Sequence, residues 1–163
     1  CGMVADNIIG PFFIQGNLNG ERYLELLQTD IVPAIQNLFP GEEFGEVWFQ
    51  QAGAPPHYSV IVRDYLNVTF PNRWIGRGVV GVLAIAWPPR SPDLTPLDFF
   101  LWGYLKDRVY KVMPANVEEL KQSIRNEIQL IPVEMIRNAI EAAYVRMGIC
   151  DVKGDSHFEH LLK

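Results

Sequence analysis

Short apolar runs, each closed by prolines or glycines, constrain the fold of this chain more than any other feature of its sequence. The run at residues 47–49 ends at "QQAGAPP", and the run at residues 84–87 ends at a pair of prolines. Runs of this length suit buried strands, and none approaches the roughly 20 apolar residues that a membrane helix needs. Residues 20–38 and 59–66 instead have apolar side chains at helical spacing. Strands that alternate with helices predict an α/β or α+β layer domain.

The two ends of the chain extend this pattern. Residues 1–16 predict two short strands or a hairpin with Asp6 and Asn7 at the turn. Asn17 or Asn19 can cap the helix over residues 20–38, and Pro40 followed by Gly41 ends it.

Three further helices are predicted in the second half. Thr95 is a suitable N-cap for an aromatic helix through about residue 106, with Pro96 at its first position and Asp98 at its third. Asn116 and Glu119 have the spacing of a capping box. A last helix follows Pro132, and its inner face should hold Met135, Ile136, Ala139, Ile140, Ala143 and Tyr144.

Composition limits the class of protein. With 163 residues, 48% of them hydrophobic, the chain can bury one core, so we expect a single domain. Within it, residues 1–110 should hold the sheet and residues 116–163 should be helical. The net charge of −5 does not suggest nucleic-acid binding over the whole surface, so any polyanion contact must be local. Cys1 and Cys150 form neither a disulfide framework nor a metal-ligand spacing, which is typical of a reducing intracellular setting.

Two long motifs carry the most specific signal. "FQQAGAPPHY" covers residues 49–58 and "WPPRSPDLTPLDFFLWGYLKDRVY" covers residues 87–110. In this order they resemble the catalytic domain of mariner-type transposases of the DDE/DDD superfamily, most closely the copies widespread in arthropod genomes. Those domains have a strand that ends in a "QDNAPxH" or "QQDGAPPHY" loop, and a downstream "SPDLxPxD" before an aromatic helix. The resemblance runs from about residue 9 to the terminal "HFEHLL", nearly the whole chain.

The resemblance implies a fold and a chemistry. The fold would be RNase H-like, a mixed sheet flanked by helices, here incomplete at the N-terminus and with a helical C-terminal tail. Three acids would hold two divalent ions, Mg²⁺ or Mn²⁺, which activate a nucleophile and stabilise the leaving oxygen in DNA strand cleavage and transfer. The implied partner is DNA at transposon ends, in the nucleus, with no membrane and no small-molecule substrate, and a homodimer is left open.

Only one of the three acids maps onto this sequence. Asp98 occupies the third position and would be the metal ligand, Ala52 stands at the second, and the first would lie upstream of Cys1. The chain begins directly in strand-like sequence, so we expect that it was cut from a longer one. Residues 79–83 also look like an insertion relative to the family, which would displace the neighbouring strand.

The acids and the loop residues have structural alternatives. Asp98 follows Thr95 by three positions, so capping and the helix dipole alone would favour an acid there. Asp93 suits a turn better than a metal site. His57 could assist near the metals or DNA, or hydrogen-bond to the loop backbone. Gln50 and Gln51 flank position 52 and are expected to face the cleft.

Basic residues around the second motif are candidates for phosphate contacts. They are Arg73, Arg77, Arg90 and Lys106, helped by Arg108 and Lys111, and the alternative is that they are solvated loop charges. We expect the nearby aromatic side chains to belong to the core rather than to stack on bases; they are Trp74, Trp87, Phe99, Phe100 and Trp102.

Three hypotheses about function follow. The leading one is a transposon-derived domain that lost phosphoryl transfer and keeps, at most, weak DNA or protein binding. The second is part of an active transposase that upstream sequence completes. The third is a co-opted scaffold or a relic without DNA chemistry.

Overall fold

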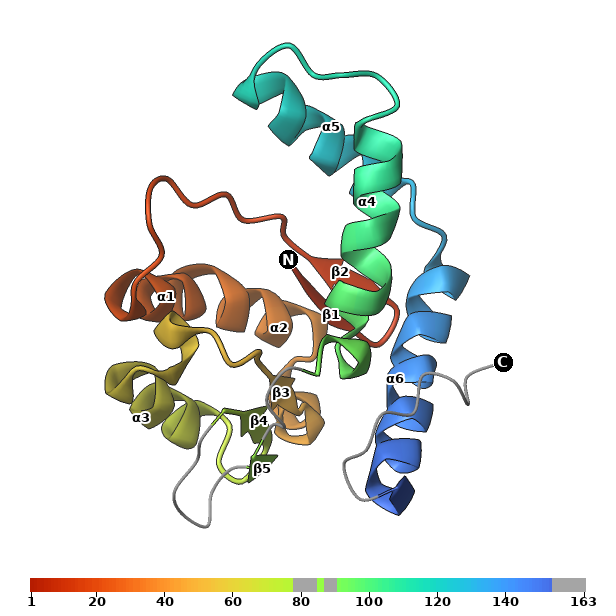
Figure 1. Cartoon of the computed structure of the whole chain (residues 1–163). Coiled ribbons are helices and arrows are strands. Elements are labelled where there is room, and N and C mark those ends of the chain that lie inside the picture. Colours follow the sequence, from red (N-terminus) through yellow and green to blue (C-terminus); the bar gives the residue numbers. More distant parts are fainter. Residues whose placement is uncertain (78–84, 87–90, 154–163) are drawn as a thin grey trace. The chain divides into compact units, whose positions relative to one another are not determined.

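The computed structural model describes residues 1–77, 85–86 and 91–153. The chain forms two compact units: unit 1 consists of Cys1–Phe13 with Ser91–Lys163, and unit 2 consists of Ile14–Arg90 (Figure 1). The first hairpin therefore belongs with the C-terminal helices, and the segment that contains "FQQAGAPPHY" folds within unit 2.

Unit 2 contains a three-stranded parallel sheet in the order β3-β4-β5. Phe49 pairs with Trp74, and Ile75 pairs with Ile85. The strands are β3 (Phe49–Gln50), β4 (Trp74–Gly76) and β5 (Ile85–Ala86). The helices are α1 (Gly20–Leu26), α2 (Val32–Leu38) and α3 (Val60–Thr69), with a π-helical turn η1 (Leu27–Ile31) and 3-10 turns η2 (Gly41–Glu46) and η3 (Pro55–Tyr58).

Strand β3 begins two residues later than predicted. The 3-10 turn η2 reaches Glu46, and the carbonyl of Val47 accepts a hydrogen bond from Arg73 Nη1 at 2.7 Å. Pairing with β4 therefore starts at Phe49, whose N–H donates to the carbonyl of Arg73 at 2.9 Å. Strand β5 lies inside the predicted range 84–87. The proposed insertion at residues 79–83, Trp87 and Arg90 lie outside the described residues.

The predicted helix over residues 20–38 is present as the continuous succession α1, η1 and α2. Asn19 caps it, since its Oδ1 accepts the N–H of Arg22 at 2.9 Å. The π-helical turn precedes Pro33, which has no N–H to continue the ladder. Of its apolar side chains, Tyr23, Leu27 and Ile35 are buried, whereas Leu38 at the helix end is 40% exposed.

The core of unit 2 lies where α1 packs on α3 (Figure 1). Phe70 packs on Phe49 of strand β3, with 5.2 Å between the ring centroids. Helix α3 extends three residues past the predicted end and buries Val62 and Leu66. Trp74 is 1% exposed, and its Nε1–H donates to Asn67 Oδ1 at 2.9 Å. Its prediction as a core residue is confirmed.

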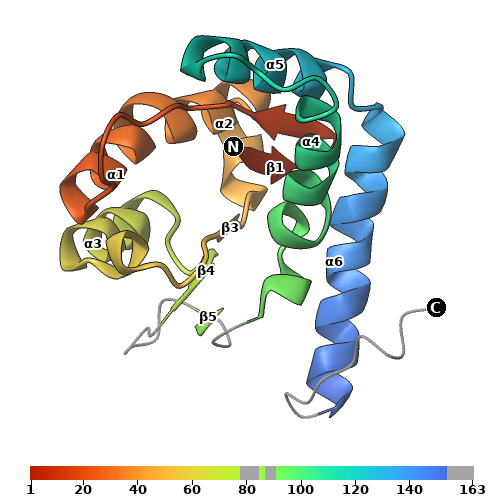
Figure 2. The same cartoon turned by 45° about the horizontal axis from the view of Figure 1, so that its top comes forward.

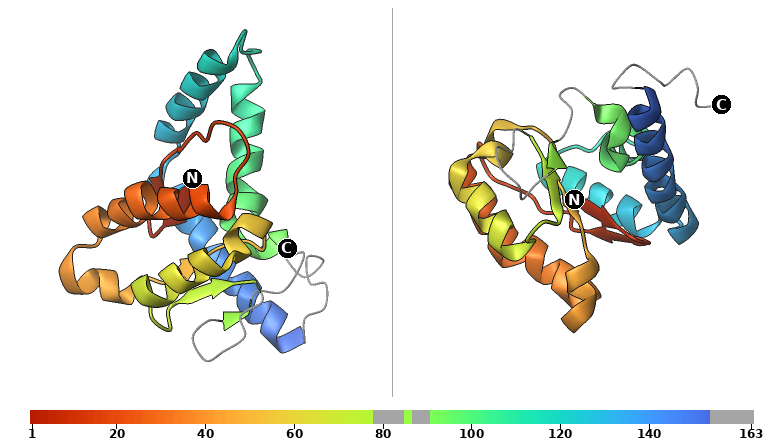
Figure 3. Two further views of the ribbon diagram at one scale, coloured as in Figure 1. Left: turned by 90° about the vertical axis from the view of Figure 1, so that its left-hand side faces the viewer. Right: turned by 90° about the horizontal axis from the view of Figure 1, so that it is seen from below.

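Unit 1 begins with the antiparallel hairpin of β1 (Gly2–Val4) and β2 (Asn7–Ile9). The turn consists of Ala5 and Asp6, with Ala5 in the left-handed region at φ 51°. Asn7 was predicted at the turn but pairs with Val4. Figure 3 shows from below how this hairpin lies beside α6 (Val133–Lys153), which contacts both strands.

The aromatic helix starts where the sequence predicts. Thr95 is extended, and its carbonyl accepts the N–H groups of Asp98 and Phe99 at 2.9 and 3.1 Å. A 3-10 turn, η4 (Pro92–Leu94), precedes it. The helix opens with a π-helical turn, η5 (Leu97–Leu101), and continues as α4 (Trp102–Val109), three residues beyond the predicted end.

Helices α4, α5 (Val117–Gln129) and α6 surround the core of unit 1 (Figure 2). Asn116 caps α5 as predicted, since its Oδ1 accepts the N–H of Glu119 at 2.9 Å. The Glu119 carboxylate accepts the N–H of Ala115 at 2.8 Å, one residue before the position that a capping box would use. The buried cluster is Leu101, Leu105, Ile131 and Ile136. On α6, Met135 and Tyr144 are 36% and 72% exposed, so their placement in the core was wrong. Each directly adjoins a buried residue and is turned about 100° from it around the helix.

No helix in the described ranges combines the length and apolar character required to span a bilayer.

Candidate functional site

The loop that contains Ala52 is built as the sequence predicts, at the end of strand β3. The N–H of Gln51 donates to the carbonyl of Ile75 at 2.9 Å, so the sheet positions the chain up to this residue. Ala52 follows with its side chain exposed to solvent. The 3-10 turn η3 then leads into α3. A methyl group therefore occupies the strand-end position where the family resemblance expects the second acid.

The side chain of His57 hydrogen-bonds to this loop. Its Nδ1 lies 2.9 Å from the carbonyl oxygen of Ala52. Because a carbonyl can only accept, Nδ1 carries the proton in this contact. The imidazole also packs on the Tyr23 ring with 4.2 Å between centroids. Of the two roles considered for His57, the structure contains the hydrogen bond to the loop backbone.

Burial keeps this pair uncharged. Removal from water lowers the pKa of His57 below 6.5, and the smaller opposing effect is its hydrogen bond to Ala52. Burial likewise raises the pKa of the Tyr23 phenol. Neutral imidazole on neutral phenol suits a packing contact.

Gln51 does not face a cleft, which corrects the prediction. Its side chain is buried at 6% exposure, and Nε2 donates to the carbonyl of His57 at 2.9 Å. Gln50 lies in β3 and is half-buried. The amide of Gln51 thus ties the strand end to η3, so the loop closes on itself through Gln51 and His57.

Two of the predicted basic residues, Arg73 and Arg77, lie in unit 2 and differ in how far they are exposed to solvent. Arg73 is half-buried, and its Nη1 donates to the carbonyls of Phe44 and Val47 at 3.0 and 2.7 Å. These bonds position the segment that enters β3. Arg77 is exposed, and its Nη1 donates to the carbonyl of Gly53 at 3.2 Å. Arg77 therefore lies against the Ala52 loop itself.

Sequence reasoning missed Arg63. Its guanidinium lies over the Tyr58 ring with 4.7 Å from Cζ to the centroid, and Arg77 lies over the same ring at 5.4 Å. The signal available in the sequence was an arginine one turn into the helix that follows "APPHY".

In unit 1, Asp98 is exposed within the π-helical turn η5, and Lys106 is exposed on α4. The carbonyl of Asp93 accepts a hydrogen bond from Arg146 Nη1 at 3.0 Å within a 3-10 turn, in agreement with a turn role. The other two basic residues form ion pairs. Arg108 Nη1 lies 3.9 Å from Glu127 Oε2, and Lys111 Nζ lies 3.7 Å from Asp107 Oδ2.

The donor set does not fit the implied metal ions. Among the residues that the structure describes, no group of three or more His, Cys, Asp or Glu side chains is placed to hold a metal. Asp98 is an exposed acid and Ala52 has no ligating atom. A two-ion site needs several carboxylates, so these residues would not hold Mg²⁺ or Mn²⁺ in that way.

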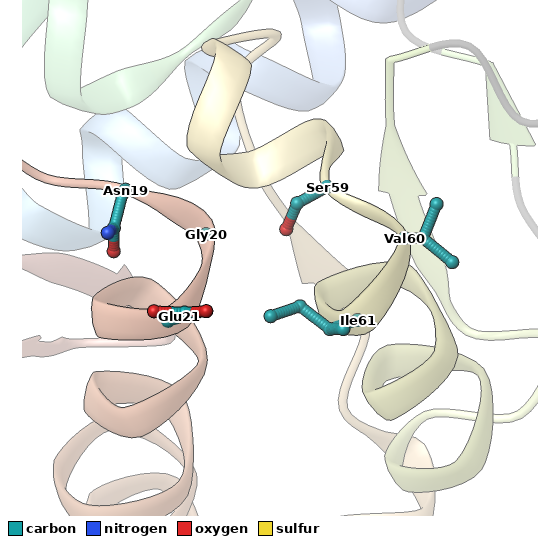
Figure 4. A pocket seen from close by; sticks show the side chains of 6 residues that line it. All are labelled: Asn19, Gly20, Glu21, Ser59, Val60 and Ile61. Carbon is teal, nitrogen blue, oxygen red and sulfur yellow. The ribbon is translucent and has the colours of Figure 1, made fainter.

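A shallow depression of about 370 Å³ lies between the N-termini of α1 and α3 (Figure 4). Glu21 is its one charged lining residue, beside the apolar Val60 and Ile61. Ser59 Oγ donates to the carbonyl of Pro56 at 3.0 Å and is thus engaged within its own turn. The depression brings together no set of groups for acid, base or nucleophilic chemistry.

No protein-family model matches the chain, but it is similar in sequence to several transposases and in structure to one solved transposase. The Tc1 transposase of Caenorhabditis elegans is 29% identical over 156 residues, and the Tcb1 transposase of Caenorhabditis briggsae is 28% identical over 157. Each alignment covers 94% of this chain and 51% of the relative, so the chain spans about half the length of these proteins.

The solved structures are those of Mos1 transposase. The catalytic domain with raltegravir and Mg has a TM-score of 0.69 and 21% identity, over 88% of this chain and 67% of that one. A pre-cleavage Mos1 transpososome has a TM-score of 0.71 and 22% identity, over 88% of this chain and 39% of that one. The predicted RNase H-like α/β fold is thereby confirmed.

Proposed function

We propose that this chain, which is homologous to the Tc1/mariner transposases, is a transposon-derived domain that binds DNA and has lost phosphoryl transfer. Its ancestral activity is metal-dependent DNA strand cleavage and transfer. The observation that carries the proposal is the exposed methyl of Ala52, at the end of β3 in a loop that is otherwise complete.

The chemistry explains why this one position matters. In-line displacement at phosphorus with two ions requires carboxylates that neutralise the ions and hold them near the reacting oxygens. An alanine supplies no oxygen ligand. The neighbouring Gln51 donates its Nε2–H to the His57 carbonyl, and its Oε1 is buried without a hydrogen-bond partner among the described residues. An amide also lacks the charge that a two-ion site needs. Loss of the second acid therefore removes the phosphoryl-transfer step while it leaves the fold intact.

DNA as the partner is supported by resemblance. One of the similar structures is a Mos1 transposase paired-end complex with left transposon end, and two others contain Mg or Mn. We extend the DNA partner to this chain, together with a nuclear location, and extend the metals only to its ancestry. A homodimer is a further proposal that size-exclusion chromatography would test.

A nicking assay tests the proposed loss of activity. Supercoiled DNA that carries Tc1/mariner-type terminal repeats is incubated with the chain and Mg²⁺ or Mn²⁺, and we expect no metal-dependent nicking. Asp98→Ala serves as the site variant. Asp107→Ala, an exposed acid on α4, is the matched control. Metal-dependent nicking that Asp98→Ala abolishes and Asp107→Ala preserves would establish the active-transposase hypothesis instead.

A second experiment tests whether an aspartate at position 52 would still bind a metal ion. A longer chain with the upstream family strand restored is compared with and without Ala52→Asp. If position 52 is the vacated ligand position, Mg²⁺ binding measured by calorimetry should appear only with the aspartate. Equal binding by both forms would show that position 52 is not part of a metal site.

A further inference from the structure

Two arginines share one aromatic ring on the surface of unit 2. Tyr58 ends η3 and is 38% exposed. The Cζ atoms of Arg63 and Arg77 lie 4.7 and 5.4 Å from its ring centroid, within the range of a cation–π contact. Arg63 comes from α3 and Arg77 follows β4. Three separate segments thus bring two positive charges to one place beside the Ala52 loop.

Neither charge is neutralised by the part of the chain that the structure describes. No carboxylate there lies within 4.0 Å of either guanidinium, whereas ion pairs form in unit 1 at Arg108, Lys111, Lys121 and Arg137. The chain has a net charge of −5, so acids are plentiful. Two like charges held at one ring repel each other, and an anion bound near them would offset that repulsion.

Both arginines also keep unused donors. A guanidinium has five N–H groups. Arg77 uses Nη1 on the carbonyl of Gly53. The Nε of Arg63 is buried and has no hydrogen-bond partner among the described residues. The aliphatic part of Arg77 lies close along the loop at Gly53: a Cβ there would approach Arg77 Cδ to 3.2 Å, so a larger residue would require Arg77 to shift slightly. Gly53 thus leaves room for Arg77 to lie against the loop with its guanidinium over Tyr58.

We propose that Arg63 and Arg77, held by the Tyr58 ring, bind the phosphates of a DNA backbone. Guanidinium forks match phosphate oxygens in geometry and charge. The guanidinium groups lie over the ring, so Tyr58 positions the arginines rather than stacking on bases. The contact would be independent of DNA sequence. The inference rests on the DNA binding that is part of the proposed function, and it assigns that binding to residues outside the ancestral acid positions.

The test measures how DNA binding depends on salt. Fluorescence anisotropy of a labelled duplex of arbitrary sequence is recorded with the full chain at a series of NaCl concentrations. Each phosphate contact contributes about one unit to the slope of log K against log salt. This slope is negative, and we expect its magnitude to decrease by about one in Arg63→Gln, by about one in Arg77→Gln, and by about two in the double variant.

Further variants separate charge from geometry. Tyr58→Phe keeps the ring and should bind like the parent, whereas Tyr58→Ser should weaken binding although it changes no charge. Arg137→Gln removes one charge from unit 1, where Arg137 faces Glu134 at 3.3 Å, and should leave the slope unchanged. Circular dichroism checks that every variant is folded. If Arg63→Gln is not folded, the exposed Arg77→Gln decides the question alone.

The outcomes distinguish the two levels of the proposal. If the parent binds DNA and the arginine variants keep the parental slope, this inference is overturned and DNA binding stands. If the parent does not bind DNA at any salt concentration, the DNA-binding part of the proposed function fails and the inference fails with it. If Arg63→Gln and Arg77→Gln lower the magnitude of the slope only as much as Arg137→Gln does, the effect is one of overall charge and the inference is also overturned.

Discussion

Replacing His57 tests whether the Ala52 loop is held by the protein itself. The imidazole donates to the carbonyl of Ala52 at 2.9 Å and packs on the Tyr23 ring at 4.2 Å. His57→Ala removes both contacts at once. If these contacts maintain the loop without a metal, the variant should be measurably less stable than the parent.

The structure sets the expected size of the effect. A net hydrogen bond contributes about 1 kcal/mol, and the Ala52 carbonyl can partly recover it from water because the loop is exposed. An aromatic pair adds about 0.5–1.5 kcal/mol beyond its buried area. The free energy of unfolding should therefore fall by about 2 kcal/mol in His57→Ala.

Urea unfolding followed by circular dichroism measures the change, and two partial variants divide it. His57→Asn keeps a donor near the position of Nδ1 and loses the ring, while His57→Phe keeps the ring and loses the donor. Each should cost about half of the full effect. If His57→Ala unfolds within about 0.5 kcal/mol of the parent, the loop does not depend on these contacts and the argument is wrong.

Other predictions concern pH, the vacant acid position, the core and a cap. Because burial lowers the pKa of His57 in the folded chain below 6.5, the unfolded chain binds the proton more tightly. The contribution of neutral His57 to stability is thus complete above pH 6.5 and is lost as pH falls through 6.5 towards the folded pKa. Urea midpoints from about pH 8 to about pH 5.5 should fall more in the parent than in His57→Asn, and parallel curves would contradict this. Ala52→Asp should change the free energy of unfolding by less than about 0.5 kcal/mol, since the side chain is exposed, and calorimetry should detect no Mg²⁺ binding by this variant of the present chain. Trp74→Ala should cost about 3–5 kcal/mol, because Trp74 is 1% exposed, or leave the chain unfolded by circular dichroism; Trp48→Ala, at a side chain that is 52% exposed, is the control and should cost far less. Asn116→Ala should destabilise by about 1 kcal/mol in the same assay through loss of the cap on α5, and an unchanged midpoint would show that the cap contributes nothing.

Much of the secondary structure could be predicted from local sequence pattern. The caps at Asn19 and Asn116, the turn into helix at Pro96 and the strand before "QQAGAPP" all depend on residues within a few positions of one another. Errors occurred where tertiary packing decides. On α6, Met135 and Tyr144 continue the apolar pattern but point away from the core, since one face of the helix suffices to bury Ile136 and Ala143.

The candidate site separates most clearly what sequence pattern predicts from what packing determines. The alanine at position 52 of a strand-end loop of this family type can be read from the sequence, because a long motif identifies its own positions. The hydrogen bonds of His57 and Gln51 to that loop, and the placement of Arg63 and Arg77 over Tyr58, become visible in the folded chain. The contacts of His57 with Tyr23 and of Arg77 with Tyr58 join segments that are distant in the chain. Such contacts depend on how α1, α3 and β4 pack, which no local spacing specifies.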